Sequence, residues 1–452
     1  MQAPAVEDTS FKRQFGLFEF LGKVRENQLL LYTPEVMARN LIQTKILFLH
    51  STLVLKPDYI EHVLLTNQAN YVKSQFVQRL LGPVLGEGLL TSEGETWRGQ
   101  RRIAAPAFNH KAVEGFVEIM AACSASLVER WKRQNGPFDL CPQMMGLTLE
   151  IIAKTMFSAD VRNQIERVRR LITILVEDNR PSAMDLFGLP QWLPRPTQTR
   201  VVAAIREFDE MVAEILEPRR GDGAERGDLL SMLMSARDPE TGSSMSDKEL
   251  RDQIVTIFLA GHETTANALG FAWWLLAQNP ETEAKLHEEV DRVLGDRRPT
   301  YADLPNLRYC KMVFEETLRL YPPAHTLSRR AVNEDVIGGA RIRASSLVSI
   351  SPYVTQRNPH LWPDPERFDP ERFTPDKVAA RHRFAYLPFG GGPRICIGMG
   401  FALAEAQVIL ASIAQAFRVK LVPGHKVEPR ATLTLRAATG IQVTLEPRLP
   451  CS

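Results

Sequence analysis

A lone cysteine in a glycine-rich loop is the first feature of this sequence that could do chemistry. Cys396 lies in the run Phe389-Gly-Gly-Gly-Pro-Arg-Ile-Cys-Ile-Gly398, which leads directly into an apolar stretch with helical spacing. Glycines allow positive φ angles and a close approach to a flat ligand, and the N–H groups at a helix start favour an anion. We therefore expect Cys396 to be a thiolate. With no second cysteine or histidine nearby, a thiolate suits the axial position of a haem iron better than a tetrahedral metal site, and a buried structural cysteine is the alternative.

A group of polar residues interrupts a second apolar helical stretch, at residues 259–266. Gly261 weakens the helix there, and Thr264 can donate to the carbonyl four residues earlier, so we expect a local widening of the helical turn. The acid Glu263 beside the hydroxyl of Thr264 could deliver protons to a reacting group, whereas a threonine pair alone would be a packing detail. His262 should point about 100° away from Glu263, toward the opposite side of the helix.

The residues around the cysteine carry a resemblance to a known family. Phe389, Gly392, Arg394, Cys396 and Gly398 match the Phe-x-x-Gly-x-Arg-x-Cys-x-Gly signature of the cytochromes P450, and the sequence resembles that family from about residue 47 to its C-terminus. The resemblance implies a mainly α-helical fold with a smaller β region, a triangular prism that holds haem b between a long distal helix and the helix after the cysteine loop. It implies a monooxygenase that uses O2 to hydroxylate or epoxidise a hydrophobic small molecule, such as a fatty acid, terpenoid, steroid or aromatic compound.

The same resemblance assigns roles to individual residues. Cys396 would be the axial ligand of the haem iron, with Phe389 and Gly398 as further cofactor contacts. Glu263 would relay protons, and Thr264 would hydrogen-bond O2 on the distal side of the haem.

The haem propionates would meet a set of indole and guanidinium groups. By resemblance these are Trp97, Arg101, Arg330 and Arg394. Trp97 and Arg101 are four residues apart and therefore share one helix face. Arg329 stands beside Arg330, and a slip of the register by one residue would exchange the two.

Three charged residues are expected to hold the long loop before the cysteine. Glu316 and Arg319 lie three residues apart on one helix face, which alone would be an ordinary surface ion pair. Residues 368–373 resemble the family's Pro-Glu-Arg-Phe element, so the resemblance places Arg372 with them in a buried triad. A buried acid between two guanidiniums must be fully hydrogen-bonded, and the role of the triad would be structural.

By resemblance, the substrate pocket is formed by the loop before Trp97, the long distal helix, the segment after Pro323 and a C-terminal turn. Most of its residues are aliphatic, which suits a hydrophobic substrate; ordinary core packing is the alternative. His325 is the polar group expected to orient a substrate or to perturb the haem. The expected pocket residues are Phe76, Leu80, Leu81, Val84, Leu259, Ala260, Ala324, His325, Leu327, Thr432 and Leu433.

Helical periodicity recurs along the chain and must supply the scaffold for these residues. It predicts helices at residues 111–133, 144–158, 201–215, 248–278, 280–294, 311–320 and 401–417. Strands are predicted at residues 47–55, 335–353 and 431–445, with Gly338-Gly339 as a hairpin turn. Residues 353–392 show no periodicity, and so long a loop needs a function. The polar run 218–228 is interpreted as a surface loop between two helices.

The composition is that of a folded protein with a large core. Of 452 residues, 44% are hydrophobic and 24% are charged, which excludes a disordered or fibrous chain. The formal net charge of +2 gives no sign of nucleic-acid or membrane-surface binding. Five scattered cysteines indicate neither a disulfide framework nor a zinc site and favour a reducing, cytoplasmic location. The apolar runs near the N-terminus are too short for a signal peptide or a membrane anchor, and we expect a single, monomeric haem domain over residues 1–452.

Electrons are expected to come from another protein, because little chain follows the last predicted helix. Arg98, Arg101, Arg102 and Lys111 lie on or near the helix of Trp97 and form a basic patch. Such a patch suits an acidic ferredoxin or flavodoxin with its NAD(P)H reductase, and a solvated basic face is the alternative.

Two other functions stay open for a protein with these residues. A haem-thiolate peroxygenase or isomerase would need no external electrons, and such relatives tend to lose the acid–alcohol pair that Glu263 and Thr264 retain. A non-enzymatic haem sensor or electron carrier would need neither this pair nor a substrate pocket.

Residues 356–358 are Gln-Arg-Asn in place of the family's His-Arg-Asp, and Arg343 and Ser345 stand where proline and glycine are usual.

Overall fold

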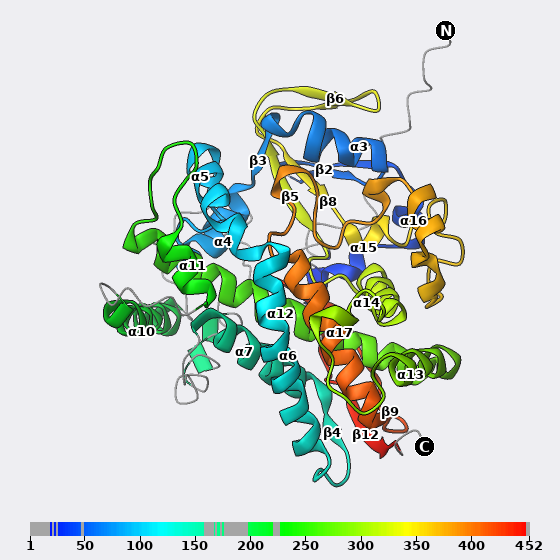
Figure 1. Ribbon diagram of the computed structural model, residues 1–452. Helices are drawn as coiled ribbons and strands as arrows, with labels where there is room; N and C mark the ends of the chain where they lie inside the picture. Colours follow the sequence, from blue (N-terminus) through cyan, green and yellow to red (C-terminus); the bar gives the residue numbers. More distant parts are fainter. Residues whose placement is uncertain are drawn as a thin grey trace.

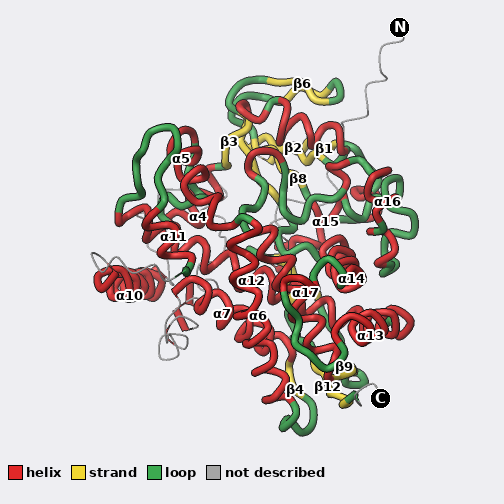
Figure 2. The backbone as a smooth tube through the Cα atoms, in the orientation of Figure 1, coloured by secondary structure: helices red, strands yellow, loops and turns green. Residues whose placement is uncertain are grey.

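Long helices form most of the molecule, and a smaller sheet lies at one end of it (Figure 1 and Figure 2). The computed structural model describes residues 26–46, 49–157, 198–219 and 227–448, with the single positions Glu19, Gly22, Lys23, Arg167, Arg170, Leu171, Ile174 and Leu175. The predicted class, mainly α with a smaller β region, is confirmed.

The helices follow the predicted periodicity to within a few residues at each end. Those longer than ten residues are α4 (Gln75–Leu85), α5 (Gly94–Ala104), α6 (His110–Trp131), α7 (Leu140–Phe157), α10 (Gln198–Leu216), α12 (Asp247–Gln278), α13 (Pro280–Leu294), α14 (Arg308–Leu320) and α17 (Met399–Ala416). Shorter ones are α2 (Pro34–Met37), α3 (Pro57–Glu61), α11 (Leu229–Ser235), α15 (Pro352–Thr355) and α16 (Pro375–Ala380). Periodicity did not predict α4, which carries Pro83 inside it, nor α5, which is largely polar.

The principal sheet joins segments that are far apart in the sequence. Its strand order is β1-β2-β8-β5-β3. Its strands are β1 (Leu41–Ile46), β2 (Leu49–Val54), β3 (Tyr71–Lys73), β5 (Leu327–Ala331) and β8 (Leu347–Ile350). The smaller sheets are made of β4 (Phe138–Asp139), β6 (Asp335–Ile337), β7 (Ala340–Ile342), β9 (Phe417–Leu421), β10 (Pro429–Ala431), β11 (Leu435–Ala437) and β12 (Gln442–Pro447). Residues 47 and 48 of the predicted strand 47–55 lie outside the described residues.

Two turns follow the backbone preferences of their residues. Gly338 and Gly339 turn the predicted hairpin between β6 and β7 with φ angles of +56° and +80°. Ser345 has a φ of +64°, the left-handed region that glycine adopts without strain. The glycine usual in the family at this position would therefore be the less strained residue.

Residues 353–392 are not the structureless loop that their sequence suggested. Short helices occupy much of this segment, including α16 and the 3₁₀ turn Pro370–Phe373. Prolines begin both of these turns, where the missing N–H is not needed. Elements of four to six residues are too short to produce a visible helical period. Of the predicted loop 218–228, residues 220–226 lie outside the described residues.

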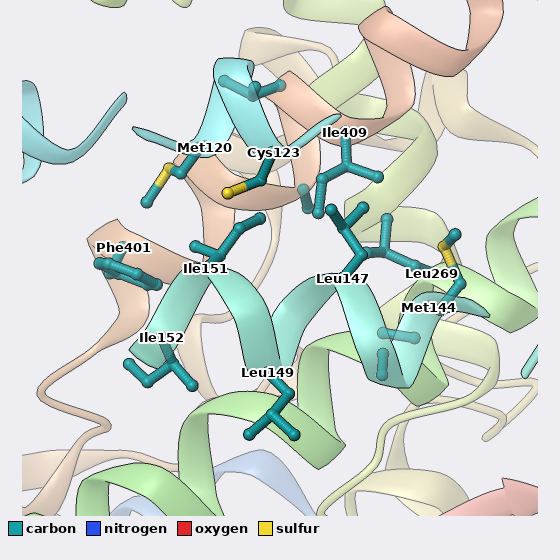
Figure 3. Close-up of a cluster of buried hydrophobic side chains, with 14 of the residues drawn as sticks. Met120, Cys123, Met144, Leu147, Leu149, Ile151, Ile152, Leu269, Phe401 and Ile409 are labelled. Atoms are coloured by element: carbon teal, nitrogen blue, oxygen red, sulfur yellow. The ribbon is translucent and has the colours of Figure 1, made fainter. Parts of the chain in front are cut away.

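The hydrophobic core is centred on α12 and the helices packed around it. α12 packs most extensively against α7, and α6 packs against α17. Figure 3 shows part of this core, in which Met144 and Leu147 of α7, Leu269 of α12 and Ile409 of α17 belong to one cluster. Among the described helices, α17 is long and apolar enough to cross a membrane, but 67% of that stretch is buried in this core. The core therefore fixes α12, which carries Glu263 and Thr264, and α17, which follows the loop of Cys396.

Candidate active site

The cysteine loop folds back on itself before α17 begins. The backbone N–H of Cys396 donates to the carbonyl of Phe389 at 2.9 Å. Gly390 and Gly392 have φ angles of +75° and +67°, and a Cβ at Gly392 would lie 1.8 Å from the carbonyl oxygen of Leu64. Only glycine fits at residue 392, for both conformational and steric reasons.

Cys396 combines exposed residue surface with a desolvated thiol. Its residue is exposed, yet burial raises the pKa of its thiol. The backbone N–H of Gly398 and the guanidinium of Arg101 lower this pKa, by less than burial raises it. In the chain alone, desolvation of an anion outweighs one N–H and one partly buried cation, and the thiolate expected at Cys396 stays a prediction. A coordinated metal ion would deprotonate the thiol outright, so Cys396 fits the role of metal ligand.

The polar segment of α12 keeps regular α-helical geometry. The expected widening at Gly261 is absent, since α12 is a continuous α-helix over Asp247–Gln278. Its capping box, from Ser246 and Glu249, and its burial along most of its length outweigh the weakness of one glycine. The hydroxyl of Thr264 donates to the carbonyl of Ala260 at 2.6 Å, as predicted. This bond leaves the lone pairs of the Thr264 oxygen to accept from another donor.

One strip of α12 is accessible, although the helix lies in the core. Ala260 is exposed and Thr264 is partly exposed, whereas Phe258 and His262 are buried. The carbonyl of His262 accepts from the hydroxyl of Thr148 in α7 at 2.9 Å. Burial lowers the pKa of His262 to about 4, so its imidazole is neutral. The accessible strip, and not His262, is available to a bound molecule.

Glu263 is buried and finds its hydroxyl partner far away in the sequence. Thr434 donates from Oγ1 to Oε1 of Glu263 at 2.6 Å. Burial raises the pKa of the Glu263 carboxyl, and Thr434, the charge of Arg436 and the side chain of Asn267 lower it. Thr432 and Leu433 of this turn were expected at the site, whereas Thr434 was not, because no local pattern connects it to Glu263.

Trp97 on α5 contacts one member of a cluster of cations. Arg394 stacks on the Trp97 ring with its guanidinium carbon 4.1 Å from the ring centroid. It also forms an ion pair with Glu93 and donates to the carbonyl of Ser92 at 2.9 Å. Trp97 and Arg394, two of the expected propionate ligands, are therefore together, and Arg101 lies near Cys396.

Two further cations belong to this cluster: Lys73, which was not predicted, and Arg329, which was named as the alternative to Arg330. Lys73 pairs with Arg329 across strands β3 and β5, so both side chains are on one face of the sheet. Burial and the charges of Arg329 and Arg394 lower the pKa of Lys73 to about 7, while Glu93 raises it. The run Tyr-Val-Lys before Ser74 could have been recognised in the sequence as a short strand. The pairing of its Lys73 with Arg329 depends on the strand register, which the sequence does not show.

This cluster fits a cofactor that carries carboxylates. Lys73, Arg329 and Arg394 share Glu93 as the carboxylate of the cluster, and Arg101 lies near Cys396. Buried cations need counter-charges, and two propionates would supply them. Alternation along β5 points Arg330 away from the face of Arg329, and the Nε of Arg330 is buried with no hydrogen-bond partner among the described residues. The role expected of Arg330 stays a prediction, and Arg329 is the arginine that lies beside Arg394.

The three charges expected beneath the cysteine loop come together in the interior. Glu316 and Arg319 are both fully buried and form a two-pronged ion pair at 2.6 and 2.8 Å. Nε of Arg372 lies 3.4 Å from Oε1 of Glu316, and the backbone N–H of Asp369 donates to the same oxygen at 2.9 Å. Arg319 also donates to three carbonyls of the loop, at residues 356, 365 and 367. The acid is fully hydrogen-bonded, as a buried carboxylate must be.

Gln356, one of the departures from the family pattern, links this triad to the cysteine loop. Its Nε2 donates to the carbonyls of Leu318 and Arg319 at 3.0 and 2.9 Å. Its Oε1 accepts from the backbone N–H of Leu387 at 2.9 Å. Because a side-chain amide donates twice and accepts, Gln356 satisfies three buried backbone groups at once.

The expected substrate residues occupy several elements around α12. Leu81, Val84 and Leu259 pack with the main core, and Leu327 packs with the cluster beside the sheet. Both ring nitrogens of His325 are engaged: Nε2 donates to the carbonyl of Thr432 at 3.1 Å, and Nδ1 accepts from the Thr326 hydroxyl at 3.1 Å. His325 is thus held in place by the chain, and its expected contact with a substrate stays a prediction.

The basic patch expected for a redox partner is smaller than the sequence suggested. Arg102 makes two hydrogen bonds to Asp238, at 2.8 and 2.7 Å, and an ion pair with Glu240. Arg98 pairs with Glu95, and Lys111 is exposed. Asp238 and Glu240 come from a loop more than a hundred residues away, so the sequence around Trp97 did not indicate that they pair with Arg102.

A buried acid on α17 has no assigned role in the site. Neither carboxyl oxygen of Glu405 has a hydrogen-bond partner among the described residues. Burial raises its pKa to about 8, against a smaller lowering by Thr265 of α12. At any pH between the pKa of an unfolded glutamate and this value, Glu405 is protonated in the folded protein and ionised in the unfolded chain. Glu405 therefore makes the protein less stable as the pH rises through that window.

We predict that Glu405→Gln stabilises the protein at neutral pH. The gain should be about 3 kcal/mol at pH 7, because pH 7 lies between the pKa of an unfolded glutamate and the value of about 8 in the folded protein, and it should be close to zero near pH 4. Urea unfolding of the holoprotein at both pH values measures it, with Glu288→Gln on the exposed face of α13 as the matched control. An equal effect of Glu405→Gln at both pH values would contradict the prediction.

Comparison with known proteins places these residues in context. A family model described as Cytochrome P450 matches residues 37–445. Cyclooctatin synthase of Streptomyces melanosporofaciens is 39% identical over 87% of this chain and 85% of its own length. Cyclooctat-9-en-7-ol 5-monooxygenase of the same organism is 37% identical over 75% of this chain and 74% of its own. Pentalenene oxygenase of Streptomyces avermitilis is 32% identical, with 87% of each chain covered.

The fold also has a close match among solved structures. The crystal structure of the cytochrome P450DA heme domain superposes with a TM-score of 0.86 at 28% sequence identity, and 97% of each chain is covered. The correspondence therefore extends over nearly the whole chain.

Proposed function

This chain belongs to the cytochrome P450 family, and we propose that it is a monooxygenase of a terpenoid hydrocarbon or alcohol. Monooxygenase activity on a hydrophobic substrate, with haem as cofactor, follows from the family and from relatives named as monooxygenase and oxygenase. The observation that carries the substrate class is the similarity to two enzymes whose names denote an unsaturated alcohol and an unsaturated hydrocarbon.

The expected pocket favours a neutral substrate over a fatty acid. Among the residues expected to line it, none is a lysine or an arginine that could pair with a carboxylate. Burial lowers the pKa of His325, so that the imidazole is neutral. A fatty-acid carboxylate in such a pocket would be desolvated without a counter-charge, whereas a hydrocarbon or an alcohol would not.

Haem b would be held from two sides by the residues described above. Cys396 would bind the iron, with Phe389 and Gly398 beside it, and Arg101, Arg394 and Trp97 would meet the propionates. To these expected ligands we add Lys73 and Arg329, which lie with Arg394. When bound, the haem supplies the iron at which O2 is activated.

Two residues of α12 would handle protons on the distal side. Glu263 holds a proton more readily than an exposed glutamate, because burial raises its pKa. Thr264 keeps its own hydroxyl proton on the carbonyl of Ala260, so its oxygen can accept a hydrogen bond from a proton donor. Acid and hydroxyl together would supply protons in a pocket that excludes bulk water.

The remaining proposals concern the protein's surroundings. The basic residues Arg98 and Lys111 support an acidic ferredoxin or flavodoxin, reduced by an NAD(P)H reductase, as the electron donor. The free cysteines Cys123, Cys141 and Cys310 support a cytoplasmic location. We propose that the chain acts as a single haem domain and as a monomer.

Substrate titration tests the proposed class. Pentalenene and a fatty acid of similar carbon number are added separately to the holoprotein, and the Soret band is followed. Pentalenene should shift the band to shorter wavelength at an at least tenfold lower concentration, about 1.4 kcal/mol in binding free energy. A fatty acid that binds equally well or better would exclude the proposed class.

We predict that Thr264→Ala uncouples electron consumption from product formation. Loss of the hydroxyl removes one step of proton delivery, so product formed per NAD(P)H should fall at least tenfold while peroxide release rises. Thr264→Ser keeps the hydroxyl and should restore most of the coupling. If hydrogen peroxide alone supports full turnover of the unaltered protein, the peroxygenase alternative replaces the monooxygenase.

A further inference from the structure

The acid of α12 is held by a residue from the other end of the chain. Thr434 lies between β10 and β11 and donates to Glu263 at 2.6 Å, a contact that spans 171 residues of sequence. Asn267, one helical turn after Glu263, donates from Nδ2 to the same threonine oxygen at 3.4 Å. The Thr434 hydroxyl thus donates a hydrogen bond to Glu263 and accepts one from Asn267. These two bonds use the O–H donor of Thr434 and one lone pair of its oxygen.

The turn that carries Thr434 is fixed to the segment expected to line the substrate pocket. The backbone N–H of Leu435 donates to the carbonyl of Pro323 at 3.0 Å. The carbonyl of Thr432 accepts from His325 at 3.1 Å, and its N–H donates to the carbonyl of Thr434 at 3.1 Å. A molecule that displaces residues 323–325 or the turn therefore moves the hydroxyl that holds Glu263.

We propose that Thr434 is the positioning residue for Glu263, and that through it the C-terminal turn couples occupation of the substrate pocket to the placement of the proton-donating acid. This inference rests on the proposed role of Glu263 in proton delivery. Thr434 itself needs no contact with substrate or cofactor, because it acts through the carboxyl group.

Few other groups act on the Glu263 carboxyl. The charged residue that affects it among the described residues is Arg436 of β11, and Asn267 is the other polar neighbour. Both lower the pKa of the carboxyl, as Thr434 does. Removal of the Thr434 hydroxyl therefore leaves a buried acid with less stabilisation of its charged form, and frees the carboxyl to rotate.

Thr434→Val tests the contact, because valine keeps the shape of threonine without its hydroxyl. The infrared band of the protonated Glu263 carboxyl is identified in the holoprotein by its absence in Glu263→Gln, and then titrated with pH. In Thr434→Val this band should move to higher frequency, and its titration midpoint should rise by about one pH unit. Thr434→Ser should restore both. Thr439→Val is the matched control, since the Thr439 hydroxyl donates to the backbone carbonyl of Lys426 at 2.8 Å and not to Glu263.

A second measurement connects the contact to the reaction. Product formed per NAD(P)H should fall about fivefold or more in Thr434→Val, with peroxide as the balance, and recover in Thr434→Ser. Equal haem content in all variants shows that each has folded. An unchanged carboxyl band in Thr434→Val overturns the proposal. The proposal is also overturned if the band shifts and Glu263→Gln forms less product per NAD(P)H, but Thr434→Val forms as much product per NAD(P)H as the unaltered protein. Full coupling in Glu263→Gln would instead overturn the proposed role of Glu263, with the band still deciding whether Thr434 holds it.

Discussion

Cys396→Ser is expected to abolish monooxygenase turnover, with activity at least a thousandfold below that of the unaltered protein. A serine hydroxyl is a far weaker donor to iron than a thiolate, and the electron release of the thiolate is what suits haem to O–O cleavage. The loop should still fold, because the backbone N–H of residue 396 and the glycine at residue 392 shape it, and neither is altered.

The carbon monoxide difference spectrum of the reduced protein measures this loss directly. The band characteristic of thiolate ligation should disappear in Cys396→Ser and persist in Cys141→Ser, the matched control. Cys141 is also a free cysteine, but burial and Asp139 raise its pKa to about 12, and it lies away from the loop. A thiolate spectrum that survives Cys396→Ser, or an iron bound by an imidazole in the unaltered protein, would end the assignment of Cys396.

Glu316→Gln is expected to destabilise the fold by about 3–5 kcal/mol, a large part of the stability of a typical domain. The variant leaves Arg319 charged in the interior, where its side chain has no exposed surface and its carboxylate partner is gone. Arg319 holds the carbonyls of three loop residues, so the segment before the cysteine should loosen at the same time. Little protein with bound haem should therefore accumulate.

Haem content after expression and urea unfolding of the purified protein measure this effect. Glu315→Gln is the matched control, one residue earlier on α14, where the partly buried acid pairs with the exposed Lys311 at 3.9 Å and is not part of the triad. This control should cost less than about 1 kcal/mol. Equal stability of the two variants would show that the triad does not hold the loop.

The sequence alone determined the features that depend on neighbours along the chain. Helical periodicity located α6, α7, α12, α13 and α17, because an apolar face repeats every 3.6 residues whatever the helix packs against. The glycine run around Cys396 and the three-residue spacing of Glu316 and Arg319 are local as well. Each of these could therefore be predicted, together with the family that they resemble.

The tertiary structure decided which charges meet. Lys73 and Arg329 share a face because of the register of β3 and β5, and a slip of one residue would turn Arg330 to that face instead. Arg102 is paired by Asp238, from a loop that no local pattern connects to it. The thiol of Cys396 has a raised pKa because burial, which periodicity does not measure, outweighs the helix start.

The partner of Glu263 shows the same division most clearly. The acid and its helix follow from local spacing, but Thr434 reaches it only because α12 packs against β11 at the end of the chain. A hydrogen bond requires that its two atoms lie about 3 Å apart in space, whatever the number of residues between them in the sequence. The residues whose roles depend on local spacing could thus be identified from the sequence. The hydrogen bond that holds Glu263 in place could be seen only in the folded chain.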